Sequence, residues 1–411
     1  MRPLVLITML ALAACDDTVE RLTSESHRAT PPTPALSRTT PVAPEPDPDP
    51  VAPDPDPSDP DPDPDPIDPN PDPDPVDPNP DPDPTDPSPD PLDPGCEADL
   101  ICIEAFPHID RRDTTAGTSR FDRYSCAPTT NESGPELAYR LEVPEDGLLV
   151  ATLQDLPAGV DVDLHLLADL DPDTCLERGH EALAAYVGAG SYYLVVDSWV
   201  SNSGAIKAGE FTLTLGLTRA SDFESQGLDA DVLALGLTAY AKAWKDRLTS
   251  RLEYTVIDFA LHSVHPRLWT IDLSDGALLF VERVTHGEGS AAADPAWAER
   301  FSNVEGSHMS SLGLMKTARR YDSSLNGLSL RLDGLEPGFN DEVRSRAIVV
   351  HGDSYASPAF VATHGRMGLS WGCQVIDPAK IPAFIDTVED GALMWTHFPD
   401  PAYLNGSTFL R

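Results

Sequence analysis

An Asp-Pro repeat from about Pro41 to Pro94 sets the strongest limit on how this chain folds. Proline fixes φ and removes the backbone donor, and it pushes the preceding residue to an extended conformation, so neither helix nor sheet forms there. The repeat holds eighteen Asp or Glu and no Lys or Arg, and their repulsion stiffens it further. At about 3.1 Å per residue it reaches roughly 170 Å when fully extended. We therefore expect residues 15–94 to be a disordered acidic spacer, with a proline-recognition ligand as the less favoured alternative.

The start of the chain combines a short apolar run with a cysteine. Residues 3–14 are largely apolar, Cys15 follows, and two Asp come next. This run is too short to span a bilayer and is typical of the central part of a signal peptide. Leu12-Ala-Ala-Cys15 resembles a bacterial lipobox, which implies removal of residues 1–14 and lipidation of Cys15. We expect an exported lipoprotein of the cell envelope, periplasmic and anchored to the inner or the outer membrane; an ordinary secretory signal is the alternative.

The charge of the chain excludes one class of partner. The formal net charge is −40 at pH 7, and much of it lies in the Asp-Pro repeat. A chain this acidic is repelled by nucleic acid and by anionic membrane surfaces. We therefore expect no nucleic-acid partner, and contact with a membrane only through the lipid anchor.

Residues 95–219 contain four of the six cysteines. An even number of cysteines in an exported segment indicates disulfides, and four cysteines allow three pairings. We favour Cys96–Cys102 and Cys126–Cys175. Short runs that alternate apolar and polar residues, separated by turn-forming residues, predict an antiparallel β-sandwich. These runs are 138–143, 160–166, 192–197 and 211–215.

Part of this region resembles an accessory domain of secreted enzymes. Asp161-Val-Asp163-Leu-His-Leu, followed by Gly188-Ala-Gly-Ser-Tyr-Tyr-Leu-Val-Val-Asp197, is similar to the motifs of bacterial pre-peptidase C-terminal (PPC-like) domains. The resemblance implies an accessory or binding role. The three Asp suggest a calcium site as one interpretation. The favoured interpretation places them on a solvent-exposed face of the sheet.

Residues 220–411 predict a mainly β domain with a few helices, and they suffice for one hydrophobic core. Apolar residues recur at helical spacing within 221–251, which predicts a helix that links or caps this domain, and a second helix is expected near 378–388. The β-type runs are 254–259, 268–273, 277–281 and 347–351. The fold class expected for the whole chain is mainly β.

Cys373 has no obvious partner among the exported cysteines. It lies in Gly368-Leu-Ser-Trp-Gly-Cys373, and a predicted strand upstream ends in His351-Gly352. An unpaired thiol in an oxidising compartment is a liability unless it is buried or used. A Cys in a Gly-flanked turn, with a His close by in the fold, is typical of a thiolate nucleophile. The imidazole would take the thiol proton, and the backbone N–H groups of Gly372 and Cys373 would receive the developing oxyanion.

These residues resemble the signature of a known family. His351-Gly352 and, 22 positions after that His, Ser370-Trp-Gly-Cys373 are similar to the His-Gly … Ser-X-Gly-Cys signature of YkuD-type L,D-transpeptidase catalytic domains. Further blocks are similar to one branch of this family, and together they cover nearly all of residues 250–398. These blocks are 257–259, 267–272, 286–290, 301–303, 306–307, 310–313 and 329–336.

The resemblance implies a mainly β catalytic fold, no cofactor and a role for each motif residue. Cys373 would be the nucleophile, His351 the general base, and Gly352 the residue whose backbone carbonyl orients the imidazole. The family's reaction is acyl transfer, in which a thiolate attacks an L,D-peptide bond next to a diamino acid in a peptidoglycan stem peptide, releases D-alanine and passes the acyl group to an amine. Trp371 replaces the usual second His and Val375 the usual Arg, and these departures bear on substrate contacts and choice of acceptor.

Residues around the motif are assigned from their chemistry. We expect Ser370, Trp371 and Arg366 to contact the substrate. Ser370 has the alternative role of only shaping the turn, and Trp371 that of lining the core or a groove. Arg346 is a second candidate for binding a carboxylate, by charge alone, and an ordinary exposed arginine is the alternative for it and for Arg366.

The remaining histidines raise two further alternatives. His364 competes with His351 for the role of base, and the family match favours His351. His286 and His308 join these two as conceivable zinc ligands. None of the four shows the close spacing of zinc-ligand pairs, so we expect no metal.

The expected function is remodelling of cell-wall peptidoglycan by a cysteine L,D-transpeptidase, with stem peptides as partners. A second possibility is an L,D-carboxypeptidase or endopeptidase that resolves the same thioester with water. The third is a non-catalytic wall-binding lipoprotein, and the presence of both Cys373 and His351 in their motifs speaks against it.

Overall fold

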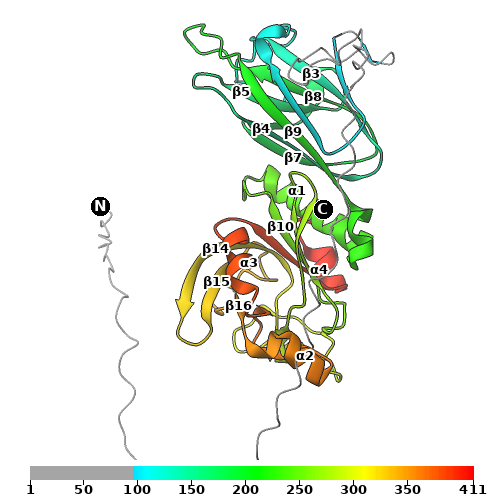
Figure 1. Ribbon diagram of the computed structural model, residues 1–411, viewed down its shortest axis with the longest axis vertical. Helices are drawn as coiled ribbons and strands as arrows, with labels where there is room; N and C mark the ends of the chain where they lie inside the picture. Colours follow the sequence, from blue (N-terminus) through cyan, green and yellow to red (C-terminus); the bar gives the residue numbers. More distant parts are fainter. Residues whose placement is uncertain (1–95, 98) are drawn as a thin grey trace, which may run out of the picture. The chain divides into compact units, whose positions relative to one another are not determined.

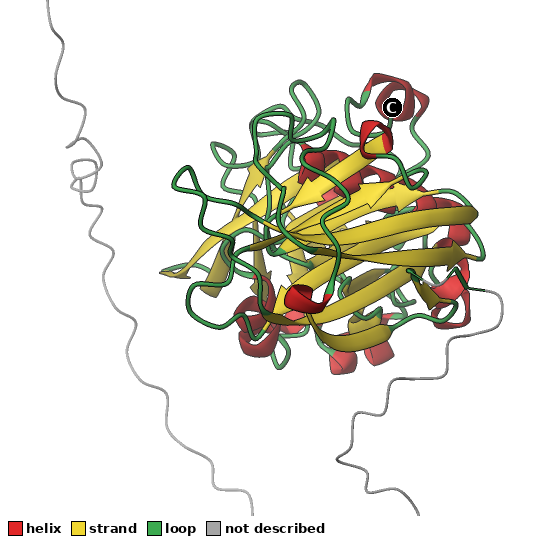
Figure 2. Cartoon of the chain, turned by 90° about the horizontal axis from the view of Figure 1, so that it is seen from above, coloured by secondary structure: helices red, strands yellow, loops and turns green. Residues whose placement is uncertain are grey.

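A computed structural model describes residues 96, 97 and 99–411 (Figure 1). The expected signal peptide, Cys15 and the Asp-Pro spacer lie outside the described residues. Strands make up most of the regular structure, as the turned view also shows (Figure 2). The prediction of a mainly β chain with few helices is confirmed. No helix among the described residues has the length and apolar character needed to cross a membrane.

The first folded region is built from two sheets. One has the strand order β1-β3-β8-β5-β6 and the other β2-β9-β4-β7. The strands are β1 Ile101–Ile103, β2 His108–Asp113, β3 Glu136–Val143, β4 Gly147–Gln154, β5 Val162–Leu167, β6 Cys175–Gly179, β7 Ala182–Val187, β8 Gly190–Ser198 and β9 Glu210–Arg219; short 3-10 turns are η1 Thr114–Ala116 and η2 Pro172–Thr174. Alternation places Phe211, Leu213 and Leu215 of β9 in the buried core between the sheets, as their spacing predicts.

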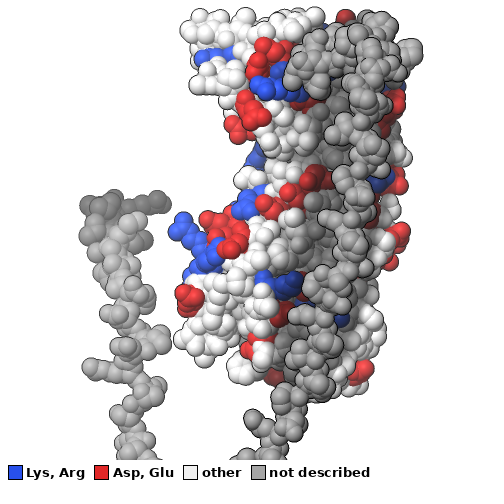
Figure 3. Space-filling view, viewed as in Figure 1, with Lys and Arg blue, Asp and Glu red and all other residues white. Residues whose placement is uncertain are grey.

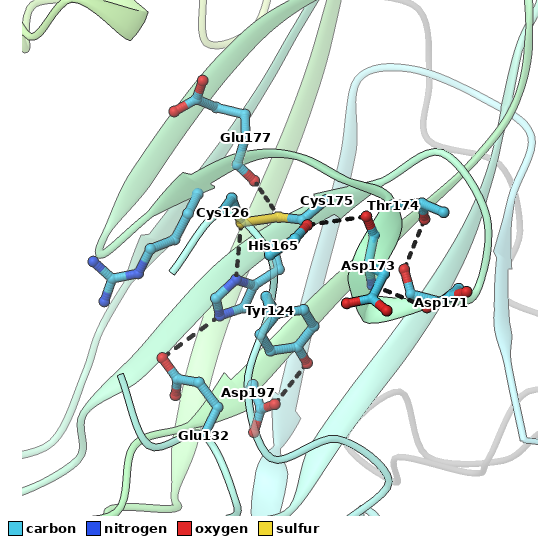
Figure 4. Close-up of a disulfide and its surroundings, with 12 residues drawn as sticks. Tyr124, Cys126, Glu132, His165, Asp171, Asp173, Thr174, Cys175, Glu177 and Asp197 are labelled. Atoms are coloured by element: carbon cyan, nitrogen blue, oxygen red, sulfur yellow. Dashed lines mark hydrogen bonds and ion pairs between the residues drawn. A yellow bond between two sulfur atoms is a disulfide. The ribbon is translucent and has the colours of Figure 1, made fainter. Parts of the chain in front are cut away.

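Two disulfides lie beside the first of these sheets. The structure joins Cys96 to Cys102 and Cys126 to Cys175, the two pairs that the sequence favours. Figure 4 shows the second bond next to His165 of β5. Tyr124 stacks on the His165 ring at 3.6 Å between centroids. The face of the sheet that the sequence assigns to solvent is therefore covered here by residues near the disulfide.

The prediction that Asp161, Asp163 and Asp197 lie on a solvent-exposed face is wrong for Asp163 and Asp197. Glu136, Asp197 and Asp163 face one another across β3, β8 and β5. Asp163 and Asp197 are only 1% and 0% exposed, so they do not lie on a solvent face. Asp197 accepts a hydrogen bond from the Tyr124 hydroxyl at 2.6 Å (Figure 4), and Asp163 accepts one from Arg178 at 2.5 Å.

A helix follows the sandwich, as the helical spacing within 221–251 predicts. It consists of the 3-10 turn η3 Ala220–Gln226 and the helix α1 Ala230–Lys245. The Asp229 carboxylate caps α1 by accepting from the Asp231 and Val232 N–H groups. The buried side of α1 contacts β4 and β7, and it also contacts β10 and β19 of the next sheet.

The C-terminal region is organised around an eight-stranded sheet of order β12-β11-β10-β19-β14-β15-β16-β18, with β13 and β17 as a separate pair. The strands are β10 Glu253–Asp258, β11 Leu268–Asp272, β12 Ala277–Glu282, β13 His286–Gly287, β14 Gly313–Ser323, β15 Gly327–Gly334, β16 Val349–Gly352, β17 Leu369–Ser370, β18 Gln374–Ile376 and β19 Leu393–His397; the helices are α2 Pro358–His364, α3 Ile381–Val388 and α4 Pro401–Gly406, and the 3-10 turns η4 Glu288–Ser290 and η5 Ser354–Ala356. The edge formed by β16 and β18 carries the signature residues.

Candidate active site

The sheet register brings His351 and Cys373 together. Strands β16 and β18 are parallel neighbours, and His351 pairs with Val375. Cys373 lies one residue before β18 and packs against the apolar cluster that contains Val375, the residue paired with His351. No hydrogen bond joins the imidazole to the thiol among the described residues. In resting enzymes the contact between base and nucleophile is often looser than in the substrate complex.

The His351 ring is held in one orientation. The side chain is 3% exposed, and Nδ1 lies 3.2 Å from the Gly352 carbonyl oxygen. When Nδ1–H donates to this oxygen, the lone pair of Nε2 is left available to accept a proton. Burial lowers the pKa of His351, which favours the neutral imidazole that a general base requires.

Gly352 is required for close packing. A Cβ atom at this position would stand 2.6 Å from Cα of Pro378 and 2.9 Å from Cγ1 of Ile381. Only glycine lets the chain after β16 approach the start of α3 this closely. The His-Gly pair thus serves both the orientation of the ring and the packing behind it.

Cys373 is the only free cysteine among the described residues. Its Sγ lies 3.8 Å from the Ala347 carbonyl oxygen. Burial raises the pKa of the Cys373 thiol, while a hydrogen bond from the Val349 backbone and the charge of Arg346 act in the opposite direction. The resting side chain is therefore a protonated thiol that needs a base.

A hydroxyl network fixes the turn that presents Cys373. Ser370 Oγ donates to the Cys373 carbonyl at 2.7 Å and accepts from the Gly372 N–H at 3.2 Å. Thr285 Oγ1 donates to the same carbonyl at 3.2 Å, and Ser310 Oγ donates to the Gly372 carbonyl at 3.2 Å. Gly372 has φ +113°, a conformation that favours glycine. The Ser-X-Gly-Cys spacing is the spacing of this closed turn.

This geometry changes two expectations. The Gly372 N–H already donates to Ser370 Oγ, so it is not free to receive an oxyanion. Ser370 is 4% exposed and holds the turn, which is the alternative role that the sequence left open for it. Sequence spacing cannot show where a backbone N–H points, because that depends on the turn's dihedral angles.

Residues 224–397 match the family model of the L,D-transpeptidase catalytic domain. This region is a YkuD-type L,D-transpeptidase domain. It therefore belongs to an enzyme class that remodels the cell wall. No curated protein matches the chain.

Solved structures include similar chains. An L,D-transpeptidase from Mycobacterium smegmatis shares 9% identity, with 62% of this chain and 93% of that one covered and a TM-score of 0.24. The L,D-transpeptidase of Xylanimonas cellulosilytica shares 16% identity, covering 38% and 69%, with a TM-score of 0.21. The pre-peptidase C-terminal domain of a Bacillus anthracis collagenase shares 13%, covering 28% and 93%, with a TM-score of 0.20. At these TM-scores it is the family match that assigns the L,D-transpeptidase domain.

Trp371 and His308 form a stacked aromatic pair next to the turn that presents Cys373. Trp371 is 69% exposed, so it does not belong to the core. Its ring stacks on His308 with centroids 4.6 Å apart and planes 6° apart, and His308 Nδ1 lies 2.7 Å from Glu288 Oε1. Sequence reasoning considered His308 only as a zinc ligand. The sequence gives no sign of this contact, because His308 lies far from Trp371 along the chain and its left-handed backbone conformation, with φ +53°, is seen only in the structure.

The other sequence candidates lie in different surroundings. Arg366 is half-buried and donates to the Met367 carbonyl at 2.8 Å. His364 ends α2, where its Nδ1 lies 2.9 Å from the Phe360 carbonyl oxygen and its ring stacks on Phe360. The pairing of β16 with β18 thus favours His351 over His364 as the base.

Among the residues that the structure describes, one group of His, Cys, Asp and Glu has the compactness of a metal site. It consists of Cys126, His165 and Cys175. The two cysteines form a disulfide, so their sulfurs are not thiolate ligands. The group therefore has no donor set for a transition metal.

On the face drawn in Figure 3, acidic and basic side chains are interspersed rather than separated by sign.

Proposed function

We propose that Cys373 is the nucleophile and His351 the general base of an L,D-transpeptidase that acts on peptidoglycan stem peptides. The supporting observation is the parallel pairing of β16 with β18, which sets His351 opposite Val375, two residues after Cys373, while Nδ1 of His351 lies at the Gly352 carbonyl. The family match of residues 224–397 supplies the reaction class.

In this proposal the imidazole acts first as a base. Nε2 of His351 takes the thiol proton as Sγ of Cys373 bonds to the carbonyl carbon of the L,D-peptide bond. The tetrahedral intermediate collapses, the C–N bond breaks, and the imidazolium returns the proton to the departing amine of D-alanine. A thioester remains on Cys373. An acceptor amine then attacks it, loses its proton to His351, and releases the thiol as the new amide forms.

The developing oxyanion needs a donor close to Cys373. We assign the N–H of Cys373 itself to this role, because the Gly372 N–H is held by Ser370 Oγ. A backbone donor fixed in a hydrogen-bonded turn needs no reorganisation during the reaction. Trp371, exposed beside the turn, would form a wall for the substrate.

Export and anchoring complete the proposal. We infer that Cys15 is lipidated, that the chain is held in the cell envelope, and that the Asp-Pro spacer lets the folded regions reach the wall. The sandwich would act as an accessory binding domain. The lipid assignment predicts that Cys15→Ser moves the protein from the membrane fraction to the soluble fraction of the envelope; retention in the membrane fraction would contradict it.

The catalytic assignment is tested by trapping the thioester. Full-length protein is incubated with disaccharide-tetrapeptide and its intact mass is measured. The wild type should gain the mass of the substrate less D-alanine, Cys373→Ala should gain none, and His351→Gln should acylate far more slowly. An adduct of equal yield on Cys373→Ala would remove Cys373 from the mechanism.

A further inference from the structure

Arg346 makes a set of hydrogen bonds that the sequence did not suggest. Nη1 donates to the Ser302 carbonyl at 2.6 Å and to Ser311 Oγ at 2.8 Å. Nη2 donates to Ser307 Oγ at 3.1 Å and to the Met309 carbonyl at 2.6 Å. A guanidinium has four N–H bonds on its two terminal nitrogens, and all four are used here. Arg346 therefore cannot grip a substrate carboxylate with both terminal nitrogens, and its expected role as a carboxylate binder is wrong for this conformation.

These four bonds hold the segment 302–311, and that segment packs against the turn 370–373, which presents Cys373 and is called the nucleophile turn below. A Cβ on Gly372 would stand 2.7 Å from the Met309 carbonyl oxygen, the same atom that Arg346 holds. Ser310 of this segment donates to the Gly372 carbonyl, and His308 stacks on Trp371. The turn that presents Cys373 thus rests on a loop whose shape depends on Arg346.

The charge of Arg346 is not neutralised locally. All four acceptors are neutral, and among the described residues no carboxylate lies within ion-pair distance of this side chain. Arg346 is half-buried, so solvent screens its charge only in part. Arg346 lowers the pKa of the Cys373 thiol by its charge. Two contacts place it near the thiol: the Met309 carbonyl that it holds lies against Gly372, and the carbonyl oxygen of the next residue, Ala347, lies 3.8 Å from Sγ.

The other titratable groups around the thiol supply no competing cation. His351 and Tyr355 pack near it and are neutral at pH 7, because burial lowers the pKa of the imidazole and raises the pKa of the phenol. Asp353 is the anion beside these two. Val375, which replaces the family's usual Arg, is fully buried in an apolar cluster with Ala356, so no cation stands there.

We propose that Arg346 is the positioning residue of the nucleophile turn and the cation that stabilises the Cys373 thiolate. This inference rests on the proposed function only where it concerns catalysis. A thiolate beside a cation is detectable by alkylation whether or not the protein transfers acyl groups.

The test compares alkylation of Cys373 across pH in the full-length protein, read out by mass on the peptide that contains Cys373. Arg346→Gln should raise the pH midpoint of alkylation by iodoacetamide by about one pH unit, the smaller end of what a nearby opposite charge produces. Arg346→Lys, which keeps the charge and loses most of the hydrogen bonds, should keep the midpoint but slow acylation by the tetrapeptide at least tenfold. Arg344→Gln is the matched control, because Arg344 is exposed and paired with Asp333 at 2.6 Å.

A second measurement needs no variant and so does not depend on variant folding. An unneutralised cation attracts anionic reagents, so iodoacetate should gain on iodoacetamide in the folded wild type relative to the urea-unfolded protein, and the gain should vanish in 1 M salt. An unchanged iodoacetate preference on folding, or an unchanged midpoint in a folded Arg346→Gln, would overturn the electrostatic role. Undiminished acylation of Arg346→Lys would overturn the positioning role. If alkylation behaves as expected but no acyl-enzyme forms in the wild type, the proposed function fails and the Arg346–Cys373 pairing stands.

Discussion

Removing the Ser370 hydroxyl would show whether catalysis depends on the closed turn that presents Cys373. In Ser370→Ala the Gly372 N–H loses the acceptor at 3.2 Å, and it is buried where water does not replace that acceptor easily. The Cys373 carbonyl loses its 2.7 Å hydrogen bond from Ser370 but keeps the one from Thr285 at 3.2 Å. The main cost is therefore one unpaired N–H, with a smaller cost from the weakened carbonyl.

These losses can be given a magnitude. An unpaired buried donor costs about 1–3 kcal/mol and an ordinary lost hydrogen bond about 1 kcal/mol, so we take a total of about 2–4 kcal/mol. Each 1.4 kcal/mol is a factor of about ten in rate. If the turn relaxes to recover its hydrogen bonds, Cys373 leaves its position and the acylation rate constant falls by roughly 30- to 700-fold.

The assay is the rate of acyl-enzyme formation, measured by intact mass, together with urea unfolding. Thr317→Val is the control, because Thr317 Oγ1, like Ser370 Oγ, is a buried hydroxyl that accepts from a backbone N–H, that of Gly391, and donates to backbone carbonyls, here those of Val388 and Ala392. The control should lose a similar free energy of unfolding and acylate within threefold of the wild type. If Ser370→Ala acylates as fast as this control, the turn does not position the nucleophile and our reasoning fails.

Three further outcomes follow from burial and packing. The alkylation rate of wild-type Cys373 should keep rising above pH 8, with no plateau at acidic pH, because burial raises the pKa of the thiol; a plateau below pH 7 would indicate a preformed thiolate. The free energy of unfolding of the sandwich should fall between pH 5 and pH 9, because burial raises the pKa of Asp197 to about 8 and also raises that of Glu132. The unfolded chain therefore releases protons that the folded one retains, and Glu132→Gln should flatten this fall in urea titrations, whereas an unchanged slope in this variant would contradict the raised pKa of Glu132. Gly352→Ala should destabilise the protein by about 1–3 kcal/mol, because its Cβ meets Pro378, and a melting temperature equal to that of the wild type would contradict the packing.

The strands and the nucleophile turn are visible in the sequence for a local reason. Alternating apolar residues such as those of β9, and the Ser-X-Gly-Cys spacing, depend on neighbours along the chain. The burial of Asp163 and Asp197 depends instead on Tyr124 and the disulfide that cover their sheet, and nothing in the local Asp pattern shows this cover.

The contacts of Arg346 were missed for the same reason. Its acceptors lie 35 to 44 positions away in the sequence, in a loop with no periodic pattern. Charge alone identified Arg346 as a carboxylate binder, whereas only the folded loop shows that its donors are already used. Contacts that join segments far apart in sequence carry no local signature, so single-sequence reasoning finds the residue type but not its partner.

The most direct test of the account is product analysis by mass spectrometry, with full-length protein and disaccharide-tetrapeptide, beside Cys373→Ala. The account predicts release of D-alanine and a cross-linked dimer that appears with the wild type and is absent with Cys373→Ala. Tripeptide without dimer would show that water resolves the thioester and would contradict transpeptidation. Dimer formed by Cys373→Ala would contradict the catalytic site itself.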